Sequence, residues 1–252
     1  MRFTEEHEAI RNTIAQFIDK EINPYCDQWE KDGIFPAHKL FKKMGDLGLL
    51  GIAKPAEYGG MGLDYSYQIV FSEELGRIAS GGVSMAIGVQ TDMSTPAMAK
   101  FGSNYIKEEF LSKAIAGDAV CSIAVSEPHA GSDVANIKTT AVKDGDDYII
   151  NGTKMWITNA TQADYLCLLA NTGGDKPHKS KSLIVVPTNT PGISFSEKLD
   201  KLGMRSSDTA QIFFDEVRVP QKNLIGEEGM GFTYQMIQFQ EERLYCAAGL
   251  LK

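Results

Sequence analysis

The sequence has little of what would assign it to several common classes. Its 25 Lys and Arg residues are outnumbered by 33 Asp and Glu residues, and the net charge of −8 argues against a nucleic-acid binder, which usually presents a basic surface. No apolar run approaches the ~20 residues that a membrane-spanning helix needs. No signal peptide or Arg/Ser-rich transit segment precedes the first predicted helix. We therefore expect a protein without a membrane span, located in the cytoplasm or the mitochondrial matrix.

Cysteine and histidine are also scarce. Neither residue type shows the paired spacing of a metal site, and the cysteines form no CxxC motif, so reduced thiols and no bound metal are expected. The residues concerned are Cys26, Cys121, Cys167, Cys246, His7, His38, His129 and His178.

The glycine-rich stretch GEEGMGF (226–232) resembles a nucleotide-binding loop only at first sight. It reads Gly-x-x-Gly-x-Gly instead of G-x-G-x-x-G, it follows no strand closely, and no βαβ unit surrounds it. A Rossmann site is therefore excluded.

Apolar residues at helical spacing dominate the first part of the chain. In TEEHEAIRNTIAQFIDKEI, Thr4 is a candidate N-cap and acidic residues fill the first turn. The apolar stripe of this segment consists of Ile10, Ile14, Phe17 and Ile18. Similar spacing recurs as far as Asp118 and predicts an all-helical domain over residues 1–118.

From residue 119 the apolar period becomes that of β-strands. Asn151-Gly152 is the strongest short hairpin signal and predicts a turn with a strand on either side. Residues 119–225 are predicted to form a central antiparallel β domain, and residues 226–252 the first helix of a further helical domain. Helices followed by strands, without βαβ alternation, indicate an α+β fold.

Two stretches of the predicted β domain carry candidate binding residues. In AVSEPHAGSDV (124–134) a strand ends at Ser126 and Glu127, and the following loop is either an ordinary turn or an anion-contacting loop. In KMWITNA (154–160), Trp156 and Thr158 share one strand face. They form either a planar-ligand site or, for Trp156, part of the core.

The loop KPHKSKS (176–182) is the strongest basic cluster in this acidic chain. It is either a solvated surface loop or a site for an anionic group.

The final segment, QMIQFQEERLYCAAGLLK, raises a question about its two acids. On a helix over residues 232–251, apolar side chains form a broad arc that includes Arg243, which is therefore expected to be buried against a partner or ligand. Glu241 lies on the polar side, and Glu242 lies near the boundary close to Cys246. Helix geometry alone leaves Glu242 as either a surface charge or a functional acid.

Several motifs, in order, resemble those of the acyl-CoA dehydrogenase family of flavoproteins. The resemblance extends from residue 3 to residue 252, and each motif alone is weak. The motifs are YGGMG (58–62), GVQTD (88–92), VSEPHAGSDV (125–134), NGTKMWITN (151–159), KLGMRSSDTAQIFFDEVRVP (201–220) and GMGF (229–232).

The resemblance implies an FAD-dependent enzyme that introduces a double bond next to a thioester. FAD would lie between the β domain and the helices, with its ring against Trp156, Ser126 at its pyrimidine edge and the Thr158 hydroxyl near N5. The implied cofactor-binding residues are Ile123, Val125, Ser126, Ser132, Trp156, Ile157 and Thr158.

The resemblance also implies an acyl-CoA substrate and a catalytic base. In the isovaleryl- and long-chain-type members, the base stands on this helix immediately before an Arg, and Glu242 in EERL matches it. The implied substrate-binding residues are Ser132, His178, Lys179, Tyr234, Gln240, Glu241 and Arg243. An electron-transfer flavoprotein as electron acceptor and a tetramer of the full-length form are implied partners.

The chain departs from the family pattern in two places. His129 replaces a Gly that follows Glu-Pro in the family, which questions the backbone angles there because Gly tolerates a positive φ. Family members continue through a further helical bundle, so this chain is expected to be C-terminally truncated, as a fragment or a short isoform. The alternatives are a non-catalytic product that binds CoA or a full-length partner, and an acyl-CoA oxidase.

Overall fold

The computed structural model describes residues 3–174 and 177–252. Helices form the first part of the chain, as the apolar spacing predicts. They are α1 (Glu5–Phe17), α2 (Cys26–Asp32), α3 (Ala37–Asp46), α4 (Tyr65–Leu75), α5 (Gly81–Gly88), α6 (Thr95–Phe101), α7 (Asn104–Ile106) and α8 (Ser112–Ala116). The π-helical turns η1 (Ile18–Ile22), η4 (Val89–Ser94) and η5 (Lys107–Leu111) continue α1, α5 and α7.

Helix α1 illustrates how the sequence sets these elements. Thr4 is its N-cap, and the Thr4 backbone N–H donates to His7 Nδ1 at 3.1 Å, so one of the first helical N–H groups finds a partner. The predicted stripe faces the helical core: Ile14, Phe17 and Ile18 are buried and Ile10 packs against them.

In the described residues, eight strands follow and form one sheet. They are β1 (Cys121–Ala124), β2 (Thr140–Asp144), β3 (Asp147–Thr158), β4 (Tyr165–Asn171), β5 (Lys181–Pro187), β6 (Ile193–Phe195), β7 (Thr209–Pro220) and β8 (Leu224–Ile225). The order is β6-β7-β3-β2-β4-β5-β8, with β1 beside β4. Pairing is antiparallel except where β4 meets β1 and β2. The α+β expectation is confirmed.

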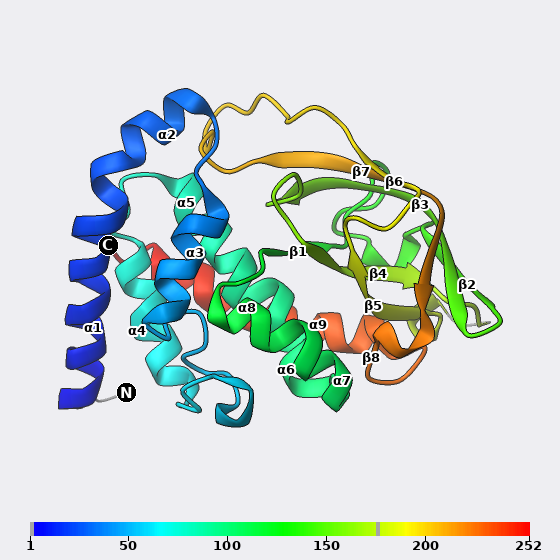
Figure 1. The fold of residues 1–252 in the computed structure, drawn as a ribbon, viewed down its shortest axis with the longest axis horizontal. Coiled ribbons are helices and arrows are strands. Elements are labelled where there is room, and N and C mark those ends of the chain that lie inside the picture. The colour runs from blue at the N-terminus through cyan, green and yellow to red at the C-terminus, as the bar shows by residue number, and fades with distance from the viewer. Residues whose placement is uncertain (1–2, 175–176) are drawn as a thin grey trace.

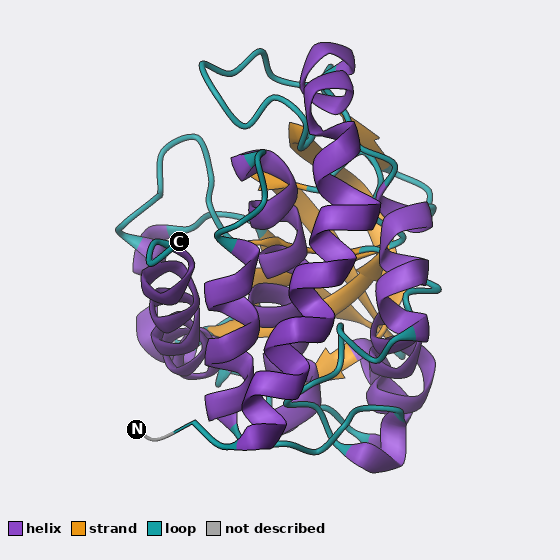
Figure 2. Ribbon diagram, turned by 90° about the vertical axis from the view of Figure 1, so that its left-hand side faces the viewer, coloured by secondary structure: helices purple, strands orange, loops and turns teal. Residues whose placement is uncertain are grey.

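The two faces of the sheet belong to different cores. Along β4, Cys167 and Leu169 face a core shared with α6 and α8, whereas Leu166 and Leu168 face a core between strands. This alternation follows from the two-residue period of a strand. Figure 1 shows the helices and the sheet as two halves, and Figure 2 shows the helices in front of the strands.

The predicted turn at Asn151-Gly152 is wrong. Strand β3 runs through both residues, and the turn lies between β2 and β3 at Gly145-Asp146, where Gly145 has φ 60°. Gly152 has φ 146°, and a Cβ there would come within 2.7 Å of the Thr139 Cα atom. The glycine therefore serves a bulge in β3 and a close backbone approach, not a turn.

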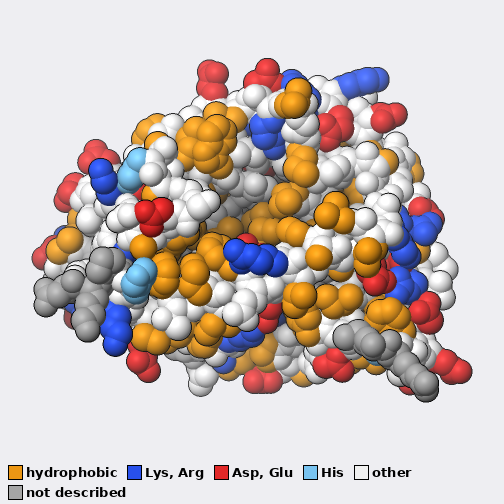
Figure 3. All heavy atoms as spheres, turned by 180° about the vertical axis from the view of Figure 1, so that it is seen from behind, with side chains coloured by type: hydrophobic (Ala, Val, Ile, Leu, Met, Phe, Trp, Pro, Cys, Tyr) orange, Lys and Arg blue, Asp and Glu red, His pale blue; other side chains and the backbone are white. Residues whose placement is uncertain are grey.

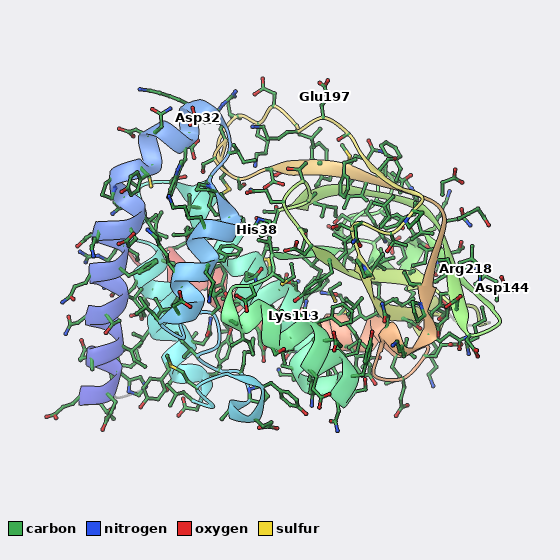
Figure 4. All side chains as sticks on the ribbon, in the orientation of Figure 1. Asp32, His38, Lys113, Asp144, Glu197 and Arg218 are labelled. Atoms are coloured by element: carbon green, nitrogen blue, oxygen red, sulfur yellow. The ribbon has the colours of Figure 1, made fainter. Side chains whose placement is uncertain are left out.

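Charge pairing fixes the observed turn. Arg218 on β7 pairs with Asp147, at 3.1 Å from Nη1 to Oδ2, and with Asp144. These groups lie at the far end of the sheet from the helices (Figure 4).

Helix α9 (Gly231–Gly249) connects the two halves. It packs against α4, η4 and α6 on the helical side and against β5 on the sheet side. Its length is below 20 residues and it carries charges, and no helix in the described part of the chain is apolar and long enough to span a bilayer. All cysteines in the described residues are free thiols, with Cys246 on α9 exposed and the others buried.

Candidate active site

A cavity of about 880 Å³ lies where strands β1 and β3 meet α5, η4 and α9. Figure 3 shows the molecule from behind, with a hollow near the middle of this face at which hydrophobic side chains gather. The apolar lining of the cavity consists of Met85, Val89, Met93, Ile123, Val125, Val134, Ala135, Ile157, Phe232, Met236 and Phe239. Its more polar lining consists of Ser126, Ser132, Asp133, Trp156, Thr158, His178, Glu242, Arg243 and Cys246, with Gly131 between.

Most residues singled out from the sequence line this one cavity. The structure brings together Ile123, Val125, Ser126, Ser132, Trp156, Ile157, Thr158, His178, Glu242 and Arg243. Lys179, Tyr234, Gln240 and Glu241 are not in its lining.

Trp156 occupies an unusual position in β3. Pairing with β7 shifts register between Lys154 and Ile157, and Trp156 adopts φ 65° and is 61% exposed. A core position is therefore excluded. A bulky residue with left-handed backbone is strained, and such strain concentrates at functional sites. The bulge turns the indole into the cavity that Thr158, two residues later, also lines.

Strand β1 ends at Ala124, before the expected end at Ser126 and Glu127, and a buried ion pair fixes the segment after it that carries Ser126. Lys154 Nζ is 2.9 Å from Glu127 Oε1 and donates to the Val125 carbonyl oxygen at 2.8 Å. The Met155 N–H donates to the Ser126 carbonyl oxygen at 2.9 Å. Successive residues of β3 thus hold successive residues of the Val125–Glu127 segment, so Ser126 and Trp156 keep a fixed relation.

The Glu127 carboxylate accepts hydrogen bonds from several donors. It also accepts the Lys138 N–H at 2.6 Å and the Thr139 N–H at 2.9 Å. Burial opposes ionisation of Glu127, but the Lys154 charge and these hydrogen bonds outweigh it and lower the pKa of Glu127. Burial lowers the pKa of Lys154 to about 8, although Glu127 opposes this. Sequence analysis did not identify this pair, because the two residues are 27 positions apart and each alone is an ordinary charge.

The turn at His129 is ordinary. Glu127 and Ala130 bridge each other, with the Glu127 N–H donating to the Ala130 carbonyl oxygen at 2.8 Å. Within the described residues, the non-glycine residues with positive φ are Trp156, Asn159, Met204 and Glu216, so His129 does not need a glycine-like backbone. The question about the backbone at His129 is thereby answered.

Glu242 presents its carboxylate to the cavity from α9. It is half-buried, and burial raises its pKa to about 7 while the Arg243 guanidinium opposes the rise. Asp92 on η4 raises it further. A carboxyl group with a pKa near neutrality is suited to accept and release a proton at physiological pH.

Arg243, expected to be buried against a partner or ligand, lines the cavity, and the apolar arc of α9 that includes it is only partly buried. Arg243 is exposed, its guanidinium lies 5.6 Å from the Phe239 ring centroid, and it donates to the Phe239 carbonyl oxygen at 2.8 Å. The helical wheel failed because the buried face of α9 is partly polar. That face consists of Gly231, Tyr234, Gln235, Gln238, Tyr245 and Ala248.

Three further residues predicted on the substrate side lie elsewhere on α9. The Tyr234 ring stacks on Phe101 with centroids 3.9 Å apart, which directs it into the core. The Glu241 carboxylate pairs with Lys100, and Gln240 is exposed. Neighbours on a helix point about 100° apart, and here Glu241 is directed toward Lys100 while Glu242 lines the cavity.

The basic segment 176–182 is only partly a solvated loop. His178 and Lys179, in the short turn η7 (Pro177–Lys179), are exposed, and the His178 ring lies 4.6 Å from that of Phe232. Lys181 is buried in β5, so it does not belong to a solvated loop. Lys176 lies outside the described residues. Over residues 3–174 and 177–252, no three His, Cys, Asp or Glu side chains are placed to hold a metal ion.

Comparison with known proteins identifies related chains. The family model described as "Acyl-CoA dehydrogenase, N-terminal domain" matches residues 4–118, and that described as "Acyl-CoA dehydrogenase, middle domain" matches residues 122–217. The mitochondrial short-chain specific acyl-CoA dehydrogenase of Rattus norvegicus is 39% identical over 248 residues, covering 98% of this chain and 60% of the relative. The mitochondrial isovaleryl-CoA dehydrogenase of Pongo abelii is 38% identical over 251 residues, covering 98% of this chain and 59% of the relative.

Solved structures of acyl-CoA dehydrogenases are also similar to this chain. A crystal structure of acyl-CoA dehydrogenase from Geobacillus kaustophilus has a TM-score of 0.93 and 42% identity, covering 98% of this chain and 65% of that one. An acyl-CoA dehydrogenase complexed with FAD from Bacillus anthracis has a TM-score of 0.91 and 31% identity, covering 98% of this chain and 42% of that one. The chain thus spans about 60% of the length of the curated relatives named here.

Proposed function

The chain belongs to the acyl-CoA dehydrogenase family, and we propose that it provides the flavin- and substrate-binding part of an enzyme that oxidises an acyl-CoA thioester to its α,β-unsaturated product. The observation that carries the proposal is the meeting of three side chains in one cavity: the proton-accepting Glu242 from α9, and Trp156 and Thr158 from β3. A base and a planar-ligand site facing one apolar space are what α-proton removal beside a redox cofactor requires.

The residues present fit a flavin. An exposed indole on strained backbone offers a stacking surface, the Thr158 and Ser126 hydroxyls offer hydrogen bonds, and the cavity of about 880 Å³ is large enough for a ring system and an acyl chain. FAD, when bound, would accept the β-hydrogen of the substrate as a hydride. We assign Ile123, Val125, Ser126, Ser132, Trp156, Ile157 and Thr158 to holding it.

Glu242 would act as the base. Its carboxylate takes the α-proton of the thioester, and its partial burial keeps it basic enough near neutral pH to do so. The methionines that line the cavity, Met85, Met93 and Met236, provide a deformable apolar surface that excludes water from the acyl chain. His178 and Arg243, which line the cavity, and Lys179 next to His178 would meet the anionic CoA part, with Ser132 between the two ligands.

The position of the base on α9 favours the isovaleryl- and long-chain-type members within the family. We further propose that residues 1–118, 119–225 and 226–252 correspond to a helical domain, a β domain and the first helix of a second helical domain. An electron-transfer flavoprotein as acceptor, a tetramer for the full-length protein, and a location in the cytoplasm or mitochondrial matrix complete the proposal.

The test is anaerobic flavin reduction. Protein purified with FAD is mixed with acyl-CoAs of graded chain length and branching, and the flavin absorbance is followed. Bleaching by at least one acyl-CoA is expected. A colourless protein that still binds acyl-CoA would favour a non-catalytic binding role, and reduced flavin that reacts rapidly with oxygen would favour an oxidase.

A further inference from the structure

A second cavity, of about 290 Å³, lies where α4, α6 and α9 meet. Several of its lining side chains are polar or charged, although most of the surrounding structure is apolar. They are Lys54, Tyr65, Gln68, Lys100 and Glu241. None of these residues has a part in the proposed reaction.

Asp92 lies between the two cavities. It is 2% exposed and belongs to η4, whose next residue, Met93, lines the first cavity. Its carboxylate accepts the Gln68 amide at 2.8 Å and the Thr91 hydroxyl at 2.7 Å, both on Oδ2. The other oxygen lies 3.5 Å from the Tyr65 hydroxyl. Gln68 and Tyr65 line the second cavity.

Lys54 is the counter-charge of Asp92. It is 8% exposed, its Nζ donates to the Thr91 carbonyl oxygen at 2.8 Å, and its charge lowers the pKa of Asp92 against the larger effect of burial. The net result is a raised pKa of Asp92, at about 6. Burying a charge is costly unless it is paired and hydrogen-bonded. The burial of the Asp92 carboxylate therefore indicates a role for this residue.

The Asp92 group is connected to α9 immediately before Glu242. The Tyr65 hydroxyl donates to the Glu241 carbonyl oxygen at 3.1 Å, so one hydroxyl faces both the buried carboxylate and the α9 backbone. One turn earlier, the Gln238 amide donates to the Met93 carbonyl oxygen and accepts the Ala97 N–H at 3.1 Å. Polar contacts from η4, α4 and α6 thus hold this turn of α9 from behind.

We propose that Tyr65 and Asp92 are positioning residues for Glu242: the Tyr65 hydroxyl holds the Gln238–Glu242 turn of α9 in place, and Asp92 keeps a negative charge behind the base. This inference rests on the proposed function, in which Glu242 removes the α-proton. It assigns a role to a buried charge that the cavity lining alone does not explain.

The charges around Glu242 determine in which direction its pKa changes when the Asp92 charge is removed. On α9 itself, Arg243 lowers the pKa of Glu242, and Cys246 lies in the same cavity; Asp133 and His178 line that cavity from the sheet side. From η4, Asp92 raises the pKa of Glu242, after burial, which is the largest cause. Removing the Asp92 charge should therefore lower the pKa of Glu242 without returning it to an ordinary value.

The direct test measures Glu242 itself and does not depend on turnover. In the 252-residue chain labelled with ¹³C at the Glu carboxyl carbons, the Glu242 signal is identified by its absence in Glu242→Gln. In Asp92→Asn, the midpoint of its NMR titration should move to lower pH. Asp208→Asn is the matched control, because Asp208 is equally buried but bonds Thr161 and Gln162 near β7, and it should leave the midpoint in place. An unchanged midpoint in Asp92→Asn would overturn the proposal.

Tyr65→Phe tests whether the Tyr65 hydroxyl supports the Gln238–Glu242 turn of α9. This variant also keeps the proposal testable if Asp92→Asn does not fold. It keeps the Asp92 charge and removes only the hydroxyl that reaches the Glu241 carbonyl oxygen. Amide hydrogen exchange in the Gln238–Glu242 turn should quicken by about fivefold, as loss of one net hydrogen bond implies. Exchange at the parent rate would show that α9 does not depend on this support.

These outcomes are separable from those of the proposed function. If Glu242→Gln still reduces flavin, Glu242 is not the base and the proposed function fails. A shift of the Glu242 titration in Asp92→Asn would then show an electrostatic interaction that has no catalytic role. If Glu242→Gln is inactive and Asp92→Asn leaves the titration unchanged, the function stands and this inference fails.

Discussion

Lys154 and Glu127 form an ion pair that is almost entirely removed from solvent, with Nζ 2.9 Å from Oε1, beside the segment after β1 that carries Ser126. Lys154 also precedes Trp156 by two residues on β3. The pair therefore couples the two strand segments that line the sheet side of the cavity.

Lys154→Met should be strongly destabilising. It leaves the Glu127 carboxylate buried with its backbone donors but without its counter-charge, which typically costs about 3–5 kcal/mol. Chemical denaturation of the folded chain gives the change in the free energy of unfolding. The matched control is Lys113→Met, which breaks the exposed Lys113–Glu109 pair and should cost less than about 1 kcal/mol. Equal losses in the two variants would show that burial of the Lys154–Glu127 pair has no energetic consequence.

Trp156→Gly should separate folding from cofactor binding. Glycine adopts the positive φ of this position without strain, and the exposed indole contributes little packing, so stability should be unchanged or rise by up to ~1 kcal/mol. FAD affinity, measured by flavin fluorescence, should fall because the stacking surface is lost. Met204→Gly, at another exposed residue with positive φ outside the cavity lining, is the control and should leave affinity intact. Unaltered FAD affinity in Trp156→Gly would remove the indole from the flavin site.

Glu242 should make stability depend on pH. Its folded pKa of about 7 exceeds the ordinary 4.5, so the folded state holds a proton between these values that the unfolded state releases. Its favourable contribution is fully present below pH 4.5 and is lost as pH rises through 7. Glu242→Gln should therefore match the parent near pH 4 and exceed its stability above pH 7 by roughly 1–3 kcal/mol. A constant difference across this range would contradict the raised pKa.

Neutralising His178 and Lys179 together should weaken acyl-CoA binding modestly. Both are exposed, and His178 lines the cavity, whereas Lys179 follows it in η7; a single exposed charge contributes less than about 1 kcal/mol and is screened by salt. The difference from the parent should be visible at low ionic strength and fade at high ionic strength. Lys39→Ala, at an exposed position on α3, is the control. Identical affinity at low salt would mean that the CoA phosphates lie elsewhere.

The sequence predicted the parts of this site that depend on local pattern. The change from helical to strand period located the two halves, and ordered motifs pointed to Trp156, Thr158 and Glu242. It misplaced the hairpin turn because Asn151-Gly152 has the composition of a turn, whereas the crowding that demands Gly152 comes from Thr139, which is distant in the sequence but lies next to the Thr140–Asn151 pair. The local sequence correctly singled out Gly152, but this glycine serves a bulge in β3 and not a turn.

The remaining errors and omissions involve contacts between distant segments. The helical wheel took the apolar arc as the inner face of α9, but Gln235 and Gln238 occupy that face. Asp92 and Lys54 look like surface charges in the sequence, and only the packing of α4, η4 and α9 shows that they are buried. Electrostatic surroundings of this kind depend on tertiary structure and leave no periodic signal in the chain.

The most direct measurement compares the rate of anaerobic flavin reduction by acyl-CoA in Glu242→Gln and Glu241→Gln, each made in the full-length, FAD-loaded protein. The two substitutions are chemically identical and adjacent, but Glu242 faces the cavity with Trp156 and Thr158, whereas Glu241 pairs with Lys100 in the second cavity. Glu242→Gln should bind FAD and acyl-CoA normally and lose reduction by a factor of at least about 10², the scale expected for a removed general base. Glu241→Gln should stay close to the parent. Near-parental reduction in Glu242→Gln would place the base elsewhere and contradict the account.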